Sequence, residues 1–149
     1  MTERVDFYIL KDATPRQGWS FACRLTEKAY LRSLTVAVLT DTEADARSLD
    51  ELLWTFNERS FVPHEIFDVH AESGHVPVYV TADSAQGPSA DLLVNLSNRL
   101  PERPDRFGRI AEIIDADAER KRLGRERFKS YRELQLPLET HQLDALNEV

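Results

Sequence analysis

A stripe of cationic and aromatic residues near the end of the chain has the spacing of one helix face. It consists of Lys121, Arg125, Phe128, Lys129 and Arg132. On a helix these side chains fall within about a third of the circumference, so they would form one continuous surface. Such a stripe can bind an anionic ligand, although a basic helix face can also simply be solvated. The ring of Phe128 favours a ligand, because an exposed ring among cations is left without apolar cover.

Two classes of ligand suit this stripe. Single-stranded nucleic acid would stack its bases on Phe128 and pair its phosphates with the cations. An acidic peptide with an apolar end would place that end beside Phe128 and its carboxylates on Lys121, Arg125 and Lys129. The charge distribution favours the peptide. Residues 119–132 hold seven basic and two acidic side chains, or +5, and subtracting +5 from the net charge of -7 leaves -12 elsewhere. That acidic body would repel a long phosphate backbone.

A second candidate surface lies at residues 54–64, Trp-Thr-Phe-Asn-Glu-Arg-Ser-Phe-Val-Pro-His. Trp54 and Phe61 are of the residue types that anchor protein interfaces, and Pro63 keeps the segment around it extended. The two rings could equally close the core. The sequence leaves both interpretations open.

Three other kinds of site find little support. In the segment that directly follows the first predicted strand, residues 11–19, Gly18 is the only glycine, so neither a dinucleotide fingerprint nor a glycine-rich phosphate loop is present. A Gly-x-Ser-x-Gly motif is absent, and Cys23 falls within a predicted apolar helix, where a buried structural thiol is expected. His70 and His75 are better explained as solvated loop residues than as metal ligands. We therefore expect no catalytic residue, no cofactor and no metal.

The elements that must position the stripe alternate between strands and helices. Strands are expected at 5–10, 34–39, 76–81 and 92–96, and helices at 19–31, about 40–56, from Pro104 through Ile114, and 119–134. This alternation predicts a three-layer α/β/α domain with a mainly parallel sheet, Rossmann-like but without a phosphate-binding glycine loop.

The composition describes one globular domain over residues 1–149, with 135–149 as a C-terminal extension that could be flexible. A chain of 149 residues, 42% of them hydrophobic, can bury its own core without metal or disulfide. A single cysteine excludes an intrachain disulfide and agrees with a cytoplasmic location. No apolar run approaches the roughly 18 residues of a membrane span, so no membrane partner is expected.

Several motifs resemble the chi subunit family of bacterial DNA polymerase III holoenzyme. They are Val5-Asp-Phe-Tyr-Ile-Leu, Leu49-Asp-Glu-Leu-Leu-Trp followed by Ser60-Phe-Val-Pro-His, and Gly124-Arg-Glu-Arg-Phe-Lys-Ser-Tyr-Arg. The resemblance extends in this order over residues 5–134. It implies a non-catalytic accessory subunit of the clamp-loader assembly in DNA replication, with a mononucleotide-binding type of fold that holds no nucleotide.

The resemblance also implies two partner surfaces. The acidic, phenylalanine-ended C-terminal tail of the single-stranded-DNA-binding protein would bind Lys121, Arg125, Phe128 and Lys129, with Tyr131 and Arg132 nearby and Ile114 or Ala118 as the apolar wall. The psi subunit of the clamp loader, or a Rad3-like helicase in some members, would dock on Trp54, Phe61, Val62 and Pro63. Phe128 stands where the family usually has tyrosine, which keeps stacking but removes a hydroxyl.

Two other function classes stay open at this stage. One is a small nucleotide-binding enzyme on the same fold, which would need a phosphate site. The other is direct binding of single-stranded nucleic acid by the basic helix, without sequence specificity.

Overall fold

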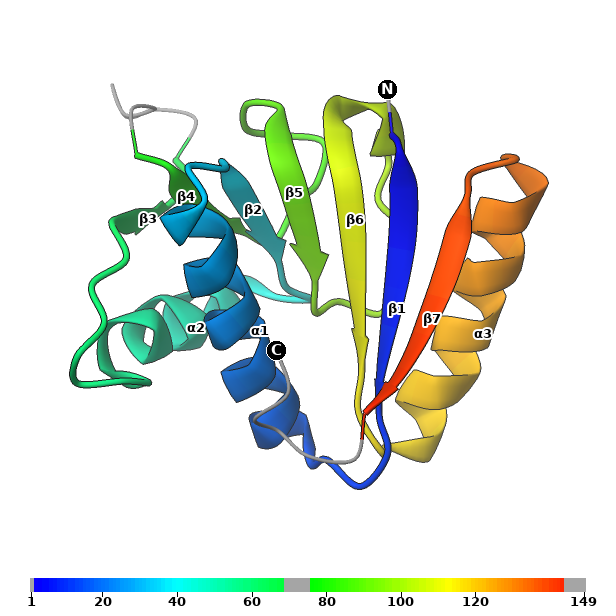
Figure 1. Ribbon diagram of the computed structural model, residues 1–149, viewed down its shortest axis with the longest axis horizontal. Coiled ribbons are helices and arrows are strands. Elements are labelled where there is room, and N and C mark those ends of the chain that lie inside the picture. Colours follow the sequence, from blue (N-terminus) through cyan, green and yellow to red (C-terminus); the bar gives the residue numbers. More distant parts are fainter. Residues whose placement is uncertain (1, 69–75, 144–149) are drawn as a thin grey trace.

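A seven-stranded sheet forms the centre of the molecule (Figure 1). The computed structural model describes residues 2–68 and 76–143. The strands are β1 (Arg4–Leu10), β2 (Val36–Leu39), β3 (His64–Ile66), β4 (Val78–Thr81), β5 (Ala90–Asn95), β6 (Phe107–Ile114) and β7 (Leu138–Leu143). They lie in the order β3-β4-β2-β5-β6-β1-β7, and every pairing between them is parallel. The predicted α/β fold with a parallel sheet is confirmed.

Three helices cover the two faces of the sheet (Figure 1). Helices α1 (Pro15–Leu31) and α2 (Glu43–Thr55) pack on one face, where their apolar side chains share a core with alternate residues of the strands. Helix α3 (Ala118–Glu133) packs on the other face, against Phe7, Ile110 and Ile114. Because side chains alternate along a strand, every strand except β3 contributes side chains to both cores.

The N-terminus of each helix is capped by a side-chain oxygen of the chain itself. Thr14 accepts a hydrogen bond from the amide of Gln17 at 3.2 Å, and the side chain of Gln17 accepts one from the amide of Thr14 at 2.9 Å. The side chain of Thr42 accepts a hydrogen bond from the amide of Asp45 in α2, and that of Asp117 accepts one from the amide of Arg120 in α3. Helix N-terminal amides are where phosphates bind in nucleotide-binding α/β folds. Here one amide in the first turn of each helix, that of Gln17, Asp45 or Arg120, already has a side-chain acceptor.

The segment after Pro104 was expected to be a helix, and this prediction is wrong. Only Pro104–Arg106 form a short 3-10 turn, and Phe107–Ile114 form β6 in the middle of the sheet. A strand that is covered on both faces carries apolar residues on both, which hides the alternation typical of a half-exposed strand. The spacing of Phe107, Ile110, Ile113 and Ile114 therefore imitates an amphipathic helix.

The C-terminal segment adds a strand to the sheet, where the sequence suggested only an extension. Strand β7 pairs in parallel with β1, from Val5 opposite Leu138 to Leu10 opposite Leu143. Residues 144–149 of the expected extension lie outside the described residues, as do His70 and His75. None of the helices in the described part of the chain combines the length and apolar character that crossing a bilayer requires.

Candidate functional site

A pocket of about 320 Å³ opens between α3 and the neighbouring strands β1 and β7. Helix α3 contributes Lys121, Gly124, Arg125 and Phe128 to its lining. The sheet side contributes Phe7, Ile9, Ile114, Thr140 and Gln142, and Lys11 follows β1 at the rim. Four of the residues predicted for tail binding therefore meet in one pocket. Of the two residues predicted for the apolar wall, Ile114 lines this pocket and Ala118 is not among its lining residues.

Phe128 is half-buried, whereas the sequence analysis expected an exposed ring. Its ring packs edge-on against Phe7, with ring centroids 5.2 Å apart, and the guanidinium of Arg132 lies 6.0 Å from its centroid. The physical reason is the position of Phe7 on β1, because that ring faces α3 and supplies the missing apolar cover. The remainder of the Phe128 ring lines the pocket.

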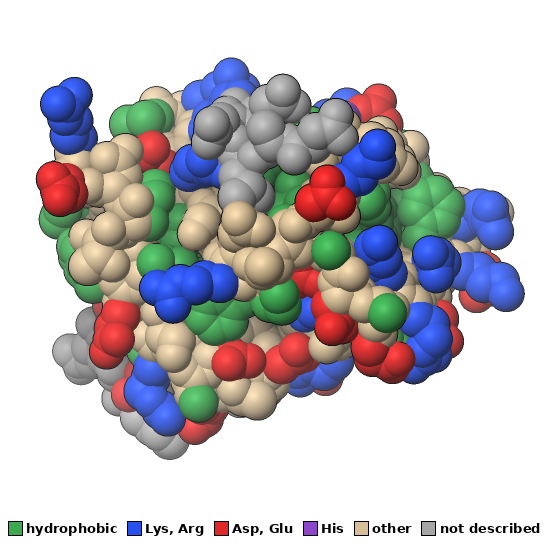
Figure 2. Space-filling view, turned by 90° about the horizontal axis from the view of Figure 1, so that it is seen from below, with side chains coloured by type: hydrophobic (Ala, Val, Ile, Leu, Met, Phe, Trp, Pro, Cys, Tyr) green, Lys and Arg blue, Asp and Glu red, His purple; other side chains and the backbone are tan. Residues whose placement is uncertain are grey.

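The seven basic residues of α3 divide into two groups. Three form ion pairs within the protein: Arg120 with Asp115, Arg122 with Glu119 and Glu126, and Arg127 with Glu112. The other four have no carboxylate partner among the residues that the structure describes, and they are Lys121, Arg125, Lys129 and Arg132. These four are the cations of the predicted stripe. Figure 2 shows Lys and Arg side chains gathered at the end of the molecule formed by α3.

Tyr131 was predicted to lie near the bound tail, but the structure places its side chain in the core beneath α3. Its hydroxyl donates a hydrogen bond to Glu112 at 2.6 Å, and Arg127 donates to the same carboxylate at 3.0 Å. Burial, together with the charge of Glu112, raises the pKa of Tyr131 well above its ordinary value. Tyr131 therefore anchors α3 to β6 and does not face the pocket.

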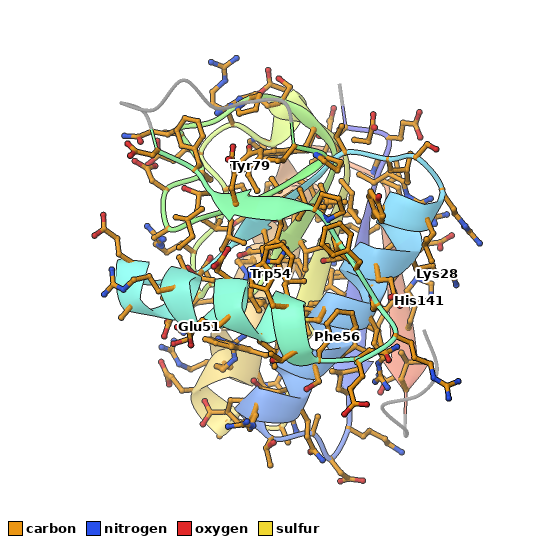
Figure 3. All side chains as sticks on the ribbon, turned by 90° about the vertical axis from the view of Figure 1, so that its left-hand side faces the viewer. Lys28, Glu51, Trp54, Phe56, Tyr79 and His141 are labelled. Atoms are coloured by element: carbon orange, nitrogen blue, oxygen red, sulfur yellow. The ribbon has the colours of Figure 1, made fainter. Side chains whose placement is uncertain are left out.

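At the second predicted surface, two aromatic side chains form an exposed patch. The rings of Trp54 and Phe61 lie 5.6 Å apart and are 47% and 68% exposed, so they do not close the core. Val62 is fully buried and Pro63 is half-buried. Figure 3 shows Trp54 projecting from α2 toward β3.

His64, which the sequence analysis did not single out, holds this patch together. Its ring stands 4.2 Å from the ring of Trp54. The two ring nitrogens contact the carbonyl oxygens of Val62 at 2.6 Å and Asp50 at 2.8 Å. The only signal in the sequence was its place directly after the Phe-Val-Pro run.

Two arginines occupy the carboxyl edge of the sheet, where open α/β folds bind their ligands. Arg99 donates hydrogen bonds to the carbonyl oxygens of Thr40 at 2.9 Å and Ala82 at 2.6 Å, and so bridges the loops after β2 and β4. Arg120 donates to the carbonyl oxygen of Leu96 at 3.1 Å. Neither role could be recognised in the sequence, because the acceptors are backbone groups far along the chain.

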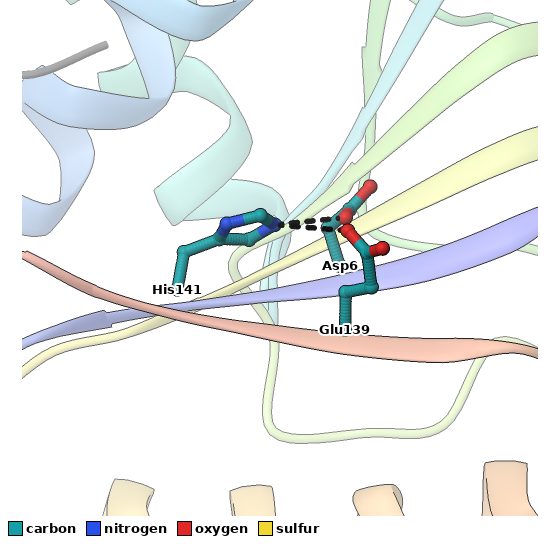
Figure 4. A group of neighbouring side chains, drawn as sticks. All are labelled: Asp6, Glu139 and His141. Atoms are coloured by element: carbon teal, nitrogen blue, oxygen red, sulfur yellow. Dashed lines mark hydrogen bonds and ion pairs between the residues drawn. The ribbon is translucent and has the colours of Figure 1, made fainter.

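One group of side chains in the described residues has donor atoms close enough to hold a metal ion (Figure 4). The donor atoms of Asp6, Glu139 and His141 lie within 4.8 Å of one another. Two guanidinium groups already neutralise Asp6, however, since Arg4 and Arg109 approach its carboxylate at 3.1 Å and 3.0 Å. The positive charge of this cluster is therefore supplied by arginine.

Comparison with known proteins gives one consistent family. The model of the family described as DNA polymerase III chi subunit, HolC, matches residues 1–139. The DNA polymerase III subunit chi of Pseudomonas aeruginosa is 35% identical over 143 residues, which cover 96% of this chain and 99% of that protein. The subunits of the same name from Haemophilus influenzae and Escherichia coli are each 28% identical, over 89% and 85% of this chain and 92% and 88% of their own lengths.

A solved S. cerevisiae structure of Dbp5 bound to Nup159, Gle1, IP6 and ADP is similar in fold. The TM-score is 0.67 at 13% identity, over 99% of this chain and 44% of the matched chain, which is more than twice as long. At this identity the similarity concerns the fold alone, an α/β domain.

Proposed function

Because the chain belongs to the chi subunit family of DNA polymerase III, whose members are replication accessory subunits, we propose that it binds the acidic C-terminal tail of the single-stranded-DNA-binding protein. Through the psi subunit it would link that tail to the clamp loader. The observation that carries the proposal is that α3 lines an apolar pocket and also carries four cations that have no carboxylate partner among the described residues. A peptide with carboxylates and a terminal phenylalanine has both features that this pocket complements.

The tail would bind with its ring inside the pocket and its carboxylates outside. The ring would lie among Phe7, Ile114 and Phe128, which together with Ile9 form the apolar part of the lining. Arg125 and Lys121 stand at the same pocket and would hold the terminal carboxylate by charge-assisted hydrogen bonds. Acidic residues preceding the ring would follow the exposed cations of α3. Exposed ion pairs are weak and are screened by salt, so we expect modest affinity, which many tails on one DNA strand would reinforce.

Calorimetry with a synthetic tail peptide tests this proposal. Arg125→Ala and Lys129→Ala should each weaken binding, by about tenfold for Arg125 at low salt, and should reduce the dependence of binding on salt. Arg122→Ala is the matched control, because Arg122 is an exposed arginine of the same helix whose charge is taken up by Glu119 and Glu126. Wild-type affinity in both test variants would refute the tail assignment.

We propose the patch of Trp54 and Phe61 as the docking surface for psi, or for a Rad3-like helicase that competes for it. The observation that favours this second site is the exposure of two adjacent large rings. Phe61→Ala should abolish co-purification with psi and leave tail binding unchanged. Leu134→Ala is a suitable control, because it removes an exposed apolar side chain elsewhere. A psi complex that survived Phe61→Ala would contradict the separation into two surfaces.

We also propose that the subunit is non-catalytic. Two observations support this view. Capping side chains already bind amides at the helix N-termini, and the guanidinium of Arg99 is bound to backbone carbonyl oxygens at the carboxyl edge, so these groups are not available to the phosphates of a nucleotide. Stabilisation by a nucleotide in a thermal-shift screen would favour the rival enzyme. Anisotropy of a labelled oligonucleotide, measured without other protein, would reveal direct single-strand binding.

A further inference from the structure

Strand β7 presents different side chains to the two faces of the sheet. Successive residues of a strand point to opposite faces. Thr140 and Gln142 line the pocket between α3, β1 and β7, which we call the tail pocket, on the α3 face. Glu139 and His141 therefore lie on the other face, where they meet Asp6 of β1 (Figure 4).

The contacts of His141 form what we call the clasp, which consists of Asp6, Tyr8 and His141. The Nε2 atom of His141 lies 2.9 Å from the Oδ1 atom of Asp6. The imidazole ring stacks on Tyr8, its neighbour in the strand register, with centroids 4.9 Å apart and planes 18° apart. The side chain of Asp6 is 4% exposed and also receives a hydrogen bond from Arg109 of β6 at 3.0 Å. The clasp thus connects β7 through β1 to β6.

Apart from its backbone pairing with β1, the middle of β7 has few contacts with the rest of the described residues. The strand lies at the edge of the sheet and pairs only with β1. Its apolar residues stand at the two ends, where Leu138 packs on the α3 core and Leu143 on the α1 core. Between them, Thr140 and Gln142 are exposed, and Glu139 is exposed and contacts Arg4 at 3.3 Å. An edge strand with so few packed side chains depends on each of them for its position.

We infer that His141 is a positioning residue for the tail pocket, acting from the opposite face of the sheet. It holds the middle of β7 against β1, so that Thr140 and Gln142 stay in place as one wall of the pocket. The inference rests on the proposed tail-binding function. It adds to that function His141, which lies on the face of the sheet opposite the ligand, and strand β7, which follows α3 in the sequence.

The test compares His141→Ala with wild type in two measurements. Calorimetry with the tail peptide should show binding weakened about three- to tenfold, the equivalent of one lost hydrogen bond. Amide hydrogen exchange without peptide should be faster within residues 138–143 and unchanged in α2 and β4. His141→Phe keeps a ring to stack on Tyr8, and His141→Gln keeps an N–H donor for Asp6, so both should bind better than His141→Ala. Arg103→Ala, which removes an exposed ion pair with Asp105, is the control.

The outcomes separate this inference from the proposed function. If Arg125→Ala binds the peptide about tenfold more weakly than wild type, and His141→Ala binds it as tightly as wild type, the clasp is refuted and the tail site stands. Faster exchange throughout the sheet would also refute it, because that pattern indicates general destabilisation. If wild type does not bind the peptide at all, the proposed function falls, and the inference falls with it.

Discussion

Gly124 allows α3 and β6 to approach closely at the tail pocket, and replacing it with alanine separates stability from binding. A Cβ atom at position 124 would lie 2.8 Å from the Cδ1 atom of Ile114, closer than two carbon atoms can pack. Both residues line the pocket. Because Cδ1 is the free end of a side chain, we expect Ile114 to change its rotamer and the helix to stay in place.

The effect of Gly124→Ala on stability is the difference of two similar terms. Alanine in place of glycine inside a helix stabilises it by about 1 kcal/mol. Moving the Ile114 side chain away from its preferred rotamer costs about 0.5–1.5 kcal/mol. The free energy of unfolding should therefore change by about 0.5 kcal/mol or less. Binding has no such compensation: a displaced methyl group in a pocket of about 320 Å³ should weaken tail binding about tenfold.

Urea unfolding and calorimetry with the tail peptide check both parts of this prediction. Gly18→Ala is the matched control. A Cβ atom at position 18 would be 3.6 Å from its nearest neighbour, the Cβ atom of Asp115, which is ordinary packing. This variant should gain up to about 1 kcal/mol of stability and bind the tail as wild type does. A loss of more than about 2 kcal/mol in Gly124→Ala would show that the helix moves. Unchanged tail affinity would show that the displaced group does not enter the pocket.

Three further outcomes concern stability. Glu112→Gln should lower the free energy of unfolding, measured in urea, by about 3 kcal/mol, because it leaves the buried charge of Arg127 without its partner. A decrease of less than about 1 kcal/mol would contradict this. Ser33→Gly should raise stability by about 1 kcal/mol in thermal unfolding, since Ser33 has a φ of 63°, and no gain would mean that this backbone is unstrained. Burial raises the pKa of Cys23 to about 12 and that of Tyr131 well above its ordinary value. The folded state then holds protons that the unfolded state releases at high pH. The contribution of these two groups to the free energy of unfolding should therefore be fully present below about pH 8.5 and decline above it. A flat profile from pH 7 to 10 would refute that assignment.

The sequence was sufficient to predict the helix that carries the site. Residues 118–133 form α3 almost as expected, because their charge and apolar spacing follow the period of a helix. Strand β6 was harder to recognise, and its assignment as a helix had a consequence for the site. An acidic residue among isoleucines, such as Glu112, looks like the polar face of an amphipathic helix. Its actual position in a buried strand is what makes it the partner of Arg127 and Tyr131.

Strand β7 could not be predicted, for a different reason. Its sequence, Leu-Glu-Thr-His-Gln-Leu, is polar between two terminal leucines, and an edge strand buries too little to impose an alternating pattern. The pairing with β1 that fixes it joins residues more than 130 positions apart, such as Tyr8 and His141. Thr140 and Gln142 therefore reach the pocket through a contact that has no local signal in the sequence.

The basic residues of α3 have three different roles, which depend on the direction in which each side chain points. Arg120 and Arg127 point inward, where they bind buried carboxylates, and their replacement should lower stability. Arg122 points to solvent between two glutamates and should tolerate replacement. We expect only the four remaining cations of the stripe to affect a partner, because within residues 2–68 and 76–143 they alone among the basic residues of α3 have no carboxylate partner. Net charge is thus a poor guide to this site: exchanging Arg122 or Arg125 for alanine changes the total equally, but only Arg125 lines the pocket.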